Sequence, residues 1–142
     1  MIKCESLGMY DVAKIEPTLT SQNDVANYSF ITDGDGITYL VMNEFAGDNA
    51  YMHDAVIPAG DFLNGYQVDA WIGKKLVVDE KHISYGSGVD FDDITAGTTL
   101  LTIKADGTLQ IAQSAPQSGI YFKVTEKTTL TENAVKVRVL SA

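Results

Sequence analysis

The sequence predicts an all-β fold, a small β-barrel or β-sandwich built from antiparallel hairpins. Two observations lead to this prediction. Short runs rich in β-branched and aromatic residues recur along the chain, and clusters of glycine, aspartate and other turn residues separate them. No window of ten or more residues has helical spacing without glycine or proline, so helix should be scarce. The predicted strands are 28–32, 37–43, 74–78, 82–85, 99–103, 108–112, 120–125 and 134–140.

With 142 residues, the chain is long enough to bury a hydrophobic core as one domain. No low-complexity linker or internal repeat divides it, so we expect a single β-rich domain over 1–142. Residues 1–17 are a possible N-terminal arm. Residues 44–66 mix glycine, asparagine and aromatic side chains without a clean period, and Pro58 and Gly60 favour an irregular excursion there.

Short turn signals join consecutive predicted strands into hairpins. The run DGDG at 33–36 separates the first two strands, and DEK at 79–81 separates the third strand from the fourth. Both linkers are short enough for an antiparallel hairpin. We therefore expect residues 28–43 and residues 74–85 to form one hairpin each.

The hydrophobic pattern decides the register of a third hairpin, over 99–112. A two-residue loop would divide the apolar side chains between both faces of the hairpin. A three-residue loop that ends in Gly107 at positive φ gathers them on one face. Because a slip of one residue turns every side chain to the other face, we expect the second register. Its cross-strand pairs are Ile103 with Leu109 and Leu101 with Ile111.

Apolar residues at every second position predict that the last two strands, 120–125 and 134–140, are half buried. If these strands pair, their outward side chains form a small ridge, although facing like charges would weaken it. The alternative is that these basic residues only offset the negative charge of the rest of the protein. The ridge residues are Tyr121, Lys123, Lys136 and Arg138.

The formal net charge of −9 and the isoelectric point near 4.4 limit the classes of partner. Such a charge opposes contacts with phosphates and with anionic membranes, so we expect no nucleic acid and no membrane as a partner. The longest uncharged run, 107–122, contains several polar residues and is not a membrane span. The N-terminus lacks the apolar stretch of a signal peptide and Cys4 has no disulfide partner, which favours the cytoplasm.

No residues stand at a familiar catalytic or metal-binding spacing. The acidic run that begins at Asp33 fails as an EF-hand loop because Thr38 occupies the position that needs glycine. The acids of 90–93 are better interpreted as a solvated loop than as a calcium site. The only histidines, His53 and His82, lack ligands at zinc spacing. We therefore predict no metal, no cofactor and no enzymatic activity.

Two further features have a structural and a functional interpretation. Trp71 and the seven tyrosines could line a sugar-binding surface, because aromatic faces stack on carbohydrate. Packing in the core and at its rim is the favoured interpretation, since the aromatic content is ordinary. Cys4 is expected to be an inert thiol, because its neighbours give it no electropositive setting.

The chain contains segments that resemble the small β-rich head decoration proteins of tailed bacteriophages. The main one is AGTTLLTIKADGTLQIAQSAPQSGIYFKV at 96–124, which is followed by AVKVRVL at 134–140. Its Gly-Thr-Leu entry, glycine turn and Gly-Ile re-entry into a valine-rich strand recur in those proteins. The chain also resembles short proteins encoded among phage and prophage structural genes, in the segments MIKCESLGMYDVAKIEP at 1–17 and IPAGDFLNGYQVDAW at 57–71.

The resemblance implies a non-enzymatic, usually trimeric accessory protein of the virion. Such a protein is made in the host cytoplasm, lies on the outer head surface and clamps the major capsid protein. Those proteins often begin with a flexible arm, whereas residues 1–17 here are rich in apolar side chains. Docking is therefore expected either through this segment, with Ile2, Leu7 and Met9, or through the ridge. The alternative function is that of a carbohydrate-binding or tail-associated β module.

Overall fold

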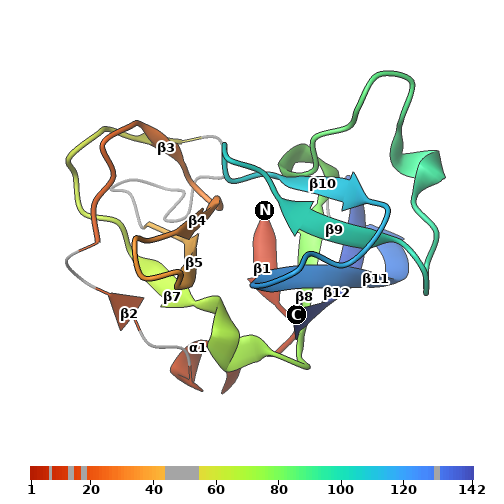
Figure 1. Cartoon of the computed structure of the whole chain (residues 1–142), viewed down its shortest axis with the longest axis horizontal. Helices are drawn as coiled ribbons and strands as arrows, with labels where there is room; N and C mark the ends of the chain where they lie inside the picture. Colours follow the sequence, from red (N-terminus) through yellow and green to blue (C-terminus); the bar gives the residue numbers. More distant parts are fainter. Residues whose placement is uncertain (7, 13–14, 17–18, 44–54, 130–131) are drawn as a thin grey trace.

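Two antiparallel sheets and a two-stranded ribbon make up the fold (Figure 1). The computed structural model describes residues 1–6, 8–12, 15–16, 19–43, 55–129 and 132–142. Strand outweighs helix, 42% against 11%, and neither sheet closes into a barrel in the described part of the chain. The all-β prediction is confirmed, in its sandwich-like form.

The six-stranded sheet has the order β1-β8-β12-β11-β9-β10, the four-stranded sheet the order β2-β7-β5-β4, and the ribbon joins β3 to β6. The strands are β1 (Ile2–Cys4), β2 (Ile15–Glu16), β3 (Val25–Ala26), β4 (Phe30–Thr32), β5 (Thr38–Val41), β6 (Val56–Ile57), β7 (Gly65–Gln67), β8 (Lys75–Asp79), β9 (Leu100–Ile103), β10 (Leu109–Ala112), β11 (Ile120–Thr129) and β12 (Asn133–Ser141). The helix α1 (Gly8–Val12) and the 3-10 turns η1 (Val68–Trp71), η2 (Glu80–His82) and η3 (Phe91–Asp93) complete the fold.

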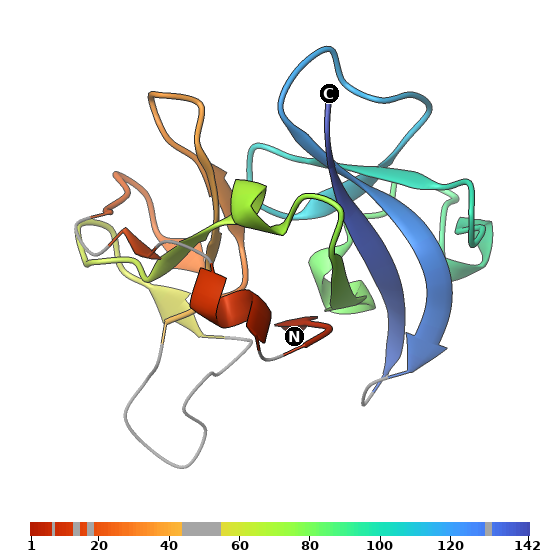
Figure 2. The same cartoon turned by 90° about the horizontal axis from the view of Figure 1, so that it is seen from below.

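The long hairpin of β11 and β12 is the centre of the six-stranded sheet, and Figure 2 shows it as the curved pair of ribbons on one side of the molecule. Alternation places one face of the hairpin in the core, as the sequence predicts. The register shifts between Val124 and Glu126, which marks a β-bulge in β11. The side chains of the buried face are Phe122, Val124, Val135, Val137 and Val139.

The hairpin of β9 and β10 has the predicted register. Ile103 pairs with Leu109 and Leu101 pairs with Ile111. Gly107 closes the three-residue loop with a φ of 87°, a conformation that is easy only for glycine. The expected apolar face is also present, since Leu101 and Leu109 are fully buried.

The turn of this hairpin joins the two sheets. The Phe30 amide of β4 donates to the Gly107 carbonyl at 2.9 Å. A Cβ on Gly107 would lie 2.8 Å from the Ser29 Cβ and 3.0 Å from the Phe30 carbonyl oxygen, closer than atoms of a packed interior approach. Behind the turn, the rings of Phe30 and Phe122 lie 5.1 Å apart. The hairpin turn therefore packs against β4 with no room for a side chain.

The first acidic turn forms the hairpin that the sequence predicts. β4 and β5 are antiparallel neighbours, and the Asp33 carboxylate accepts hydrogen bonds from the Asp35 and Ile37 amides at 2.9 and 3.0 Å. The second expected hairpin, over 74–85, is wrong. β8 pairs instead with β1 and β12.

The chain leaves the sheet after β8 because Asp79 caps a 3-10 turn. Its carboxylate accepts from the Lys81 amide, a local bond that competes with continued strand pairing. Ile83 then forms a parallel bridge with Leu109, and the Ser84 amide donates to the Leu109 carbonyl at 2.7 Å. The predicted strand 82–85 is thus reduced to a single bridge on the far edge of the sheet.

The described residues of the N-terminal segment pack into the fold. Ile2 pairs with Val78, and Ile2 and Met9 are only 1% and 4% exposed. The Tyr10 hydroxyl accepts from the Cys4 amide at 2.9 Å, so helix α1 covers the outer edge of β1. Ile2 and Met9 are core residues, which argues against docking through them; Leu7 lies outside the described residues.

Two other expectations concern the middle of the chain. Within the predicted excursion 44–66, residues 44–54 lie outside the described residues. The rest is partly regular, because β6 pairs with β3 and β7 begins at Gly65 between β2 and β5. Trp71 is a core residue, 0% exposed, and its indole donates to the Met9 carbonyl at 2.7 Å. The core interpretation of Trp71 is confirmed.

Gly107→Ala should lower the free energy of unfolding by about 3 kcal/mol, because a left-handed alanine costs roughly 1 kcal/mol and overpacking about 1–3 kcal/mol. Gly107→Val should cost more. The control is Gly97→Ala, since Gly97 also has positive φ (90°) but has no atom within 4 Å of an added Cβ. Urea unfolding measures the stability of Gly107→Ala and of Gly97→Ala. Equal losses of stability in these two variants would contradict the packing contact.

Candidate functional site

The acidic residues considered as metal ligands hold local structure. In η3 the Asp90 carboxylate accepts from the Asp92 amide at 2.9 Å, and the Asp93 carboxylate accepts from the Asp90 amide at 2.8 Å. This reciprocal arrangement is a capping box. Among the described residues, no group of three or more His, Cys, Asp or Glu side chains has a geometry that could hold a metal ion.

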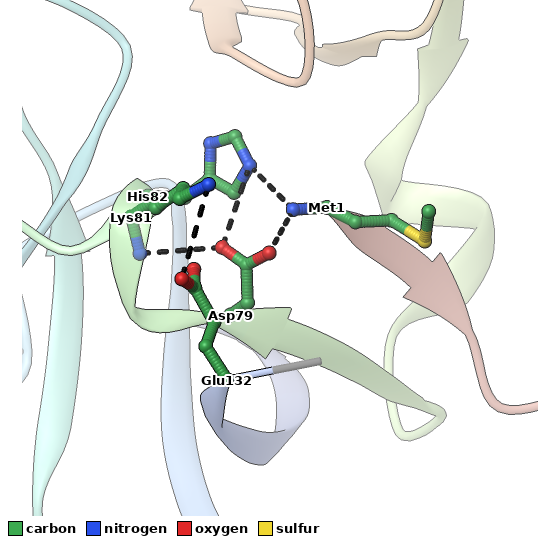
Figure 3. Close-up of polar contacts among 5 residues, drawn as sticks. All are labelled: Met1, Asp79, Lys81, His82 and Glu132. Atoms are coloured by element: carbon green, nitrogen blue, oxygen red, sulfur yellow. Dashed lines mark hydrogen bonds and ion pairs between the residues drawn. The ribbon is translucent and has the colours of Figure 1, made fainter. Parts of the chain in front are cut away.

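A partly buried polar cluster joins the N-terminus to the end of β8 (Figure 3). The Met1 amino group forms an ion pair with Asp79 and lies 2.9 Å from His82 Nε2. Lys81 and Glu132 form an ion pair at 3.8 Å beside them. None of these five residues carries a hydroxyl or a thiol that the His–Asp pair could activate as a nucleophile. Its contacts hold β1 against β8.

The ridge predicted from the last two strands is part of a larger basic face. Lys123 lies opposite Arg138 across β11 and β12, and Arg138 lies opposite Lys75 across β12 and β8. These three basic residues thus form one row over three neighbouring strands. Tyr121, opposite Leu140, is on the same outward face.

A second row runs beside the first. Lys3 lies opposite Val77, which lies opposite Lys136. Val77 is only 5% exposed although it faces outward, as expected where lysine stems flank an apolar side chain. We call the five residues Lys3, Lys75, Lys123, Lys136 and Arg138 the basic face. It holds half of the ten basic residues in a chain of net charge −9.

Few acids neutralise the basic face. Lys136 has ion pairs with Glu5 at 3.9 Å and Glu126 at 3.8 Å, and the bulge in β11 brings Glu126 opposite it. No carboxylate of the described residues forms an ion pair with the other four. Like charges that face each other across strands destabilise a sheet. An anionic partner would relieve this repulsion, so the basic face is suited to an acidic surface.

The second candidate site is a pocket of about 420 Å³ between the two sheets. Its volume is in the range of ligand sites. Three tyrosines from different elements form much of its wall, and the N-terminal strand forms another part. The lining residues are Met1, Ile2, Lys3, Tyr10, Tyr28, Met42 and Tyr66.

Tyr28 reaches this pocket from a strained backbone. Its φ is 61°, the left-handed region, at a cost on the order of 1–2 kcal/mol for a residue with a side chain. Tyr28 donates its amide to the Val41 carbonyl at 2.8 Å, and the Val41 amide donates to the Ser29 carbonyl at 2.9 Å. Two residues therefore face one, which is a β-bulge, and bulges redirect side chains near binding sites.

Two groups close to the N-terminus, the Tyr10 hydroxyl and the Cys4 thiol, have raised pKa values because they are buried. Burial raises the pKa of Tyr10 to about 12 and that of Cys4 to about 11. Both groups therefore remain neutral near pH 7. Cys4 is also only 6% exposed, so its thiol is unsuited to nucleophilic chemistry.

Comparison with known proteins gives no relative for this chain. No family model, no curated protein and no solved structure matches it. In the described residues, no helix is long and apolar enough to cross a membrane. The geometry of the basic face and of the pocket is therefore the basis for a function.

Lys123→Glu should raise the free energy of unfolding by roughly 0.2–1 kcal/mol at low salt, because it replaces a like-charged cross-strand pair with an attractive one. The gain should shrink at 0.5 M NaCl through screening. Lys123→Gln removes the repulsion without adding attraction. Its stability in urea unfolding should lie between those of the wild type and Lys123→Glu. A destabilising Lys123→Glu would show that the row is already compensated.

Cys4 should resist iodoacetamide at pH 8 in the native protein and react readily in urea, because a thiol with a pKa near 11 is about 0.1% ionised at that pH. The folded state holds this proton more tightly than the unfolded chain, whose thiol pKa is about 8.5. Stability should therefore fall as the pH rises from about 8.5 towards 11. Cys4→Ala should flatten this part of the pH profile, and fast native labelling would contradict the burial.

Proposed function

We propose that this protein is a non-enzymatic virion accessory protein that decorates the outer surface of a phage head. It docks on an acidic surface of the major capsid protein through the basic face. The observation that carries this proposal is the gathering of five basic side chains on one outward sheet face of a strongly acidic chain. The sequence resemblance over 96–140 supplies the class of partner.

The burial of Ile2 and Met9 favours one of the two docking modes. Ile2 and Met9 are committed to the core, so they are not free to contact a capsid. Lys123, Lys75 and Arg138, in contrast, are on the outward face of the central strands. Opposite charges across an interface accelerate encounter and fix orientation. The basic face is therefore the better docking surface.

An accessory protein of a head binds many symmetry-related sites. Modest contacts suffice in such a case, because a trimer that engages several sites at once gains affinity through avidity. The net charge of −9 also repels the nucleic acid and anionic membranes that a basic face would otherwise attract. Docking on an acidic protein surface is consistent with the basic face and with the negative net charge of the whole chain.

The carbohydrate-binding alternative has weaker support. Trp71 is 0% exposed and its ring packs on Tyr66 with centroids 6.1 Å apart. It therefore offers no open face on which a sugar could stack. A tail location, in contrast, uses the same basic face and is an outcome of the experiment below.

Co-sedimentation with heads assembled from the major capsid protein of the parent genome tests the proposal. The wild-type protein should pellet with the heads, whereas Lys123→Glu and Arg138→Glu should each weaken binding about tenfold at 0.15 M salt, an effect reduced by higher salt. Lys104→Glu is the control, because Lys104 lies at the hairpin turn beside Asp106 and outside the basic face.

Lys123→Glu is informative because we expect it to be at least as stable as wild type, so that lost binding cannot reflect unfolding. Cryo-electron microscopy of the particle then locates the protein. Density on the outer head surface supports the proposal. Density in the tail, equal binding by the charge reversals, or tighter binding to nucleic acid than to heads would overturn it.

A further inference from the structure

The pocket between the sheets is assembled from residues far apart in the sequence. Tyr10 comes from α1, Tyr28 from the bulge before β4, and Tyr66 from β7. The rings of Tyr10 and Tyr66 meet edge to face with centroids 5.9 Å apart. The pocket walls are therefore held by packing between elements, which keeps their shape fixed before any ligand arrives.

Tyr28 combines a strained backbone with a side chain that packs in the core and lines the pocket. Glycine would adopt a φ of 61° freely at this position, so the bulge itself does not require a tyrosine. The tyrosine side chain contributes a pocket wall, and its ring lies 5.7 Å from that of His82. Strain that persists at a cavity wall is typical of binding sites.

The lining chemistry selects the kind of ligand. Aromatic rings favour other aromatic rings edge to face or stacked, and thioethers such as those of Met1 and Met42 make favourable contacts with rings. A sugar would bring several hydroxyl groups that need hydrogen-bond partners. Among the lining side chains only three phenolic hydroxyls and one ammonium could supply them. An aromatic ring fits these walls better than a sugar.

The charge at the pocket is positive. Lys3 is the one charged side chain among the lining residues, and it is exposed. No carboxylate of the described residues forms an ion pair with it. An ammonium group beside an apolar pocket favours a ligand with an anionic group next to its apolar part.

We propose that this pocket binds a planar aromatic group that carries a carboxylate, with the ring between Tyr10, Tyr28 and Tyr66 and the carboxylate at Lys3. The site shares Lys3 with the basic face but would exist whether or not the protein docks on a head. The ligand is either a free aromatic acid or an aromatic residue beside an acidic residue in a peptide. Both present the same chemistry to the pocket.

Calorimetry and NMR with indole-3-acetate and its neutral analogue indole-3-acetamide test the proposal. The acid should bind about tenfold more tightly than the amide, the effect of one charge-assisted hydrogen bond. Methyl resonances of Met42 and Ile2 should shift on binding. Acetyl-Glu-Trp-Glu-amide distinguishes the two sources: tighter binding than indole-3-acetate identifies a peptide, and weaker binding identifies a small molecule.

Three variants separate the pocket from general attraction to the basic face. Lys3→Gln should remove the preference for the acid and leave the affinity for the amide unchanged. Lys75→Gln, the same change on the basic face but outside the pocket lining, should leave both affinities unchanged. Tyr28→Gly, which relieves the backbone strain and removes one wall, should weaken both ligands at least fivefold while the circular dichroism spectrum stays that of a β protein.

Several results would overturn the proposal. One such result is that neither indole compound binds at millimolar concentration. Equal affinity for acid and amide is another, and so is an equal loss in Lys75→Gln and Lys3→Gln. Tighter binding of methyl glucoside than of indole-3-acetate would assign the pocket to sugars. None of these outcomes bears on capsid docking, so the two proposals fail independently.

Discussion

The contact between the Gly107 turn and β4 is the constraint on which the other features depend. Through the hydrogen bond from Phe30 to Gly107, the last third of the chain holds the four-stranded sheet in place. Tyr28 and its bulge directly precede Phe30, so the same contact positions a wall of the pocket. With no space for a Cβ at Gly107, any side chain there would push the turn away from β4. The pocket between the two sheets follows from this close approach.

Local patterns predicted the hairpins whose strands are close in the sequence. For 99–112, alternation and one glycine were sufficient, because a shift of one residue would expose Leu101 and Leu109. The failures are long-range. β8 pairs with β1 across more than seventy residues, and no local signal encodes that choice over a hairpin with 82–85. Ile2 and Met9 belong to short elements whose apolar residues indicate burial only when the partner surface is known.

The basic face was predictable only in part, because local patterns again indicate neighbours within one hairpin and not between distant strands. Alternation placed Lys123 and Arg138 on one outward face, and they are direct neighbours. No local pattern indicates Lys3 or Lys75, because they join the face through strand order alone. The bulge near Val124 moves Lys136 opposite Glu126, and bulges leave weak sequence signals. Tyr28 was missed because no glycine marks its left-handed backbone.

The unfavourable features of this structure are concentrated beside its candidate sites. A row of three basic residues lowers the stability of the central strands, and a left-handed tyrosine strains the edge of the pocket. An acid at Lys123 would remove the repulsion, and a glycine at position 28 would remove the backbone strain, although it would also remove a ring that is buried in the core. Lys3 belongs to both sites. A carboxylate held in the pocket would therefore neutralise one charge of the basic face and weaken its attraction to an acidic surface.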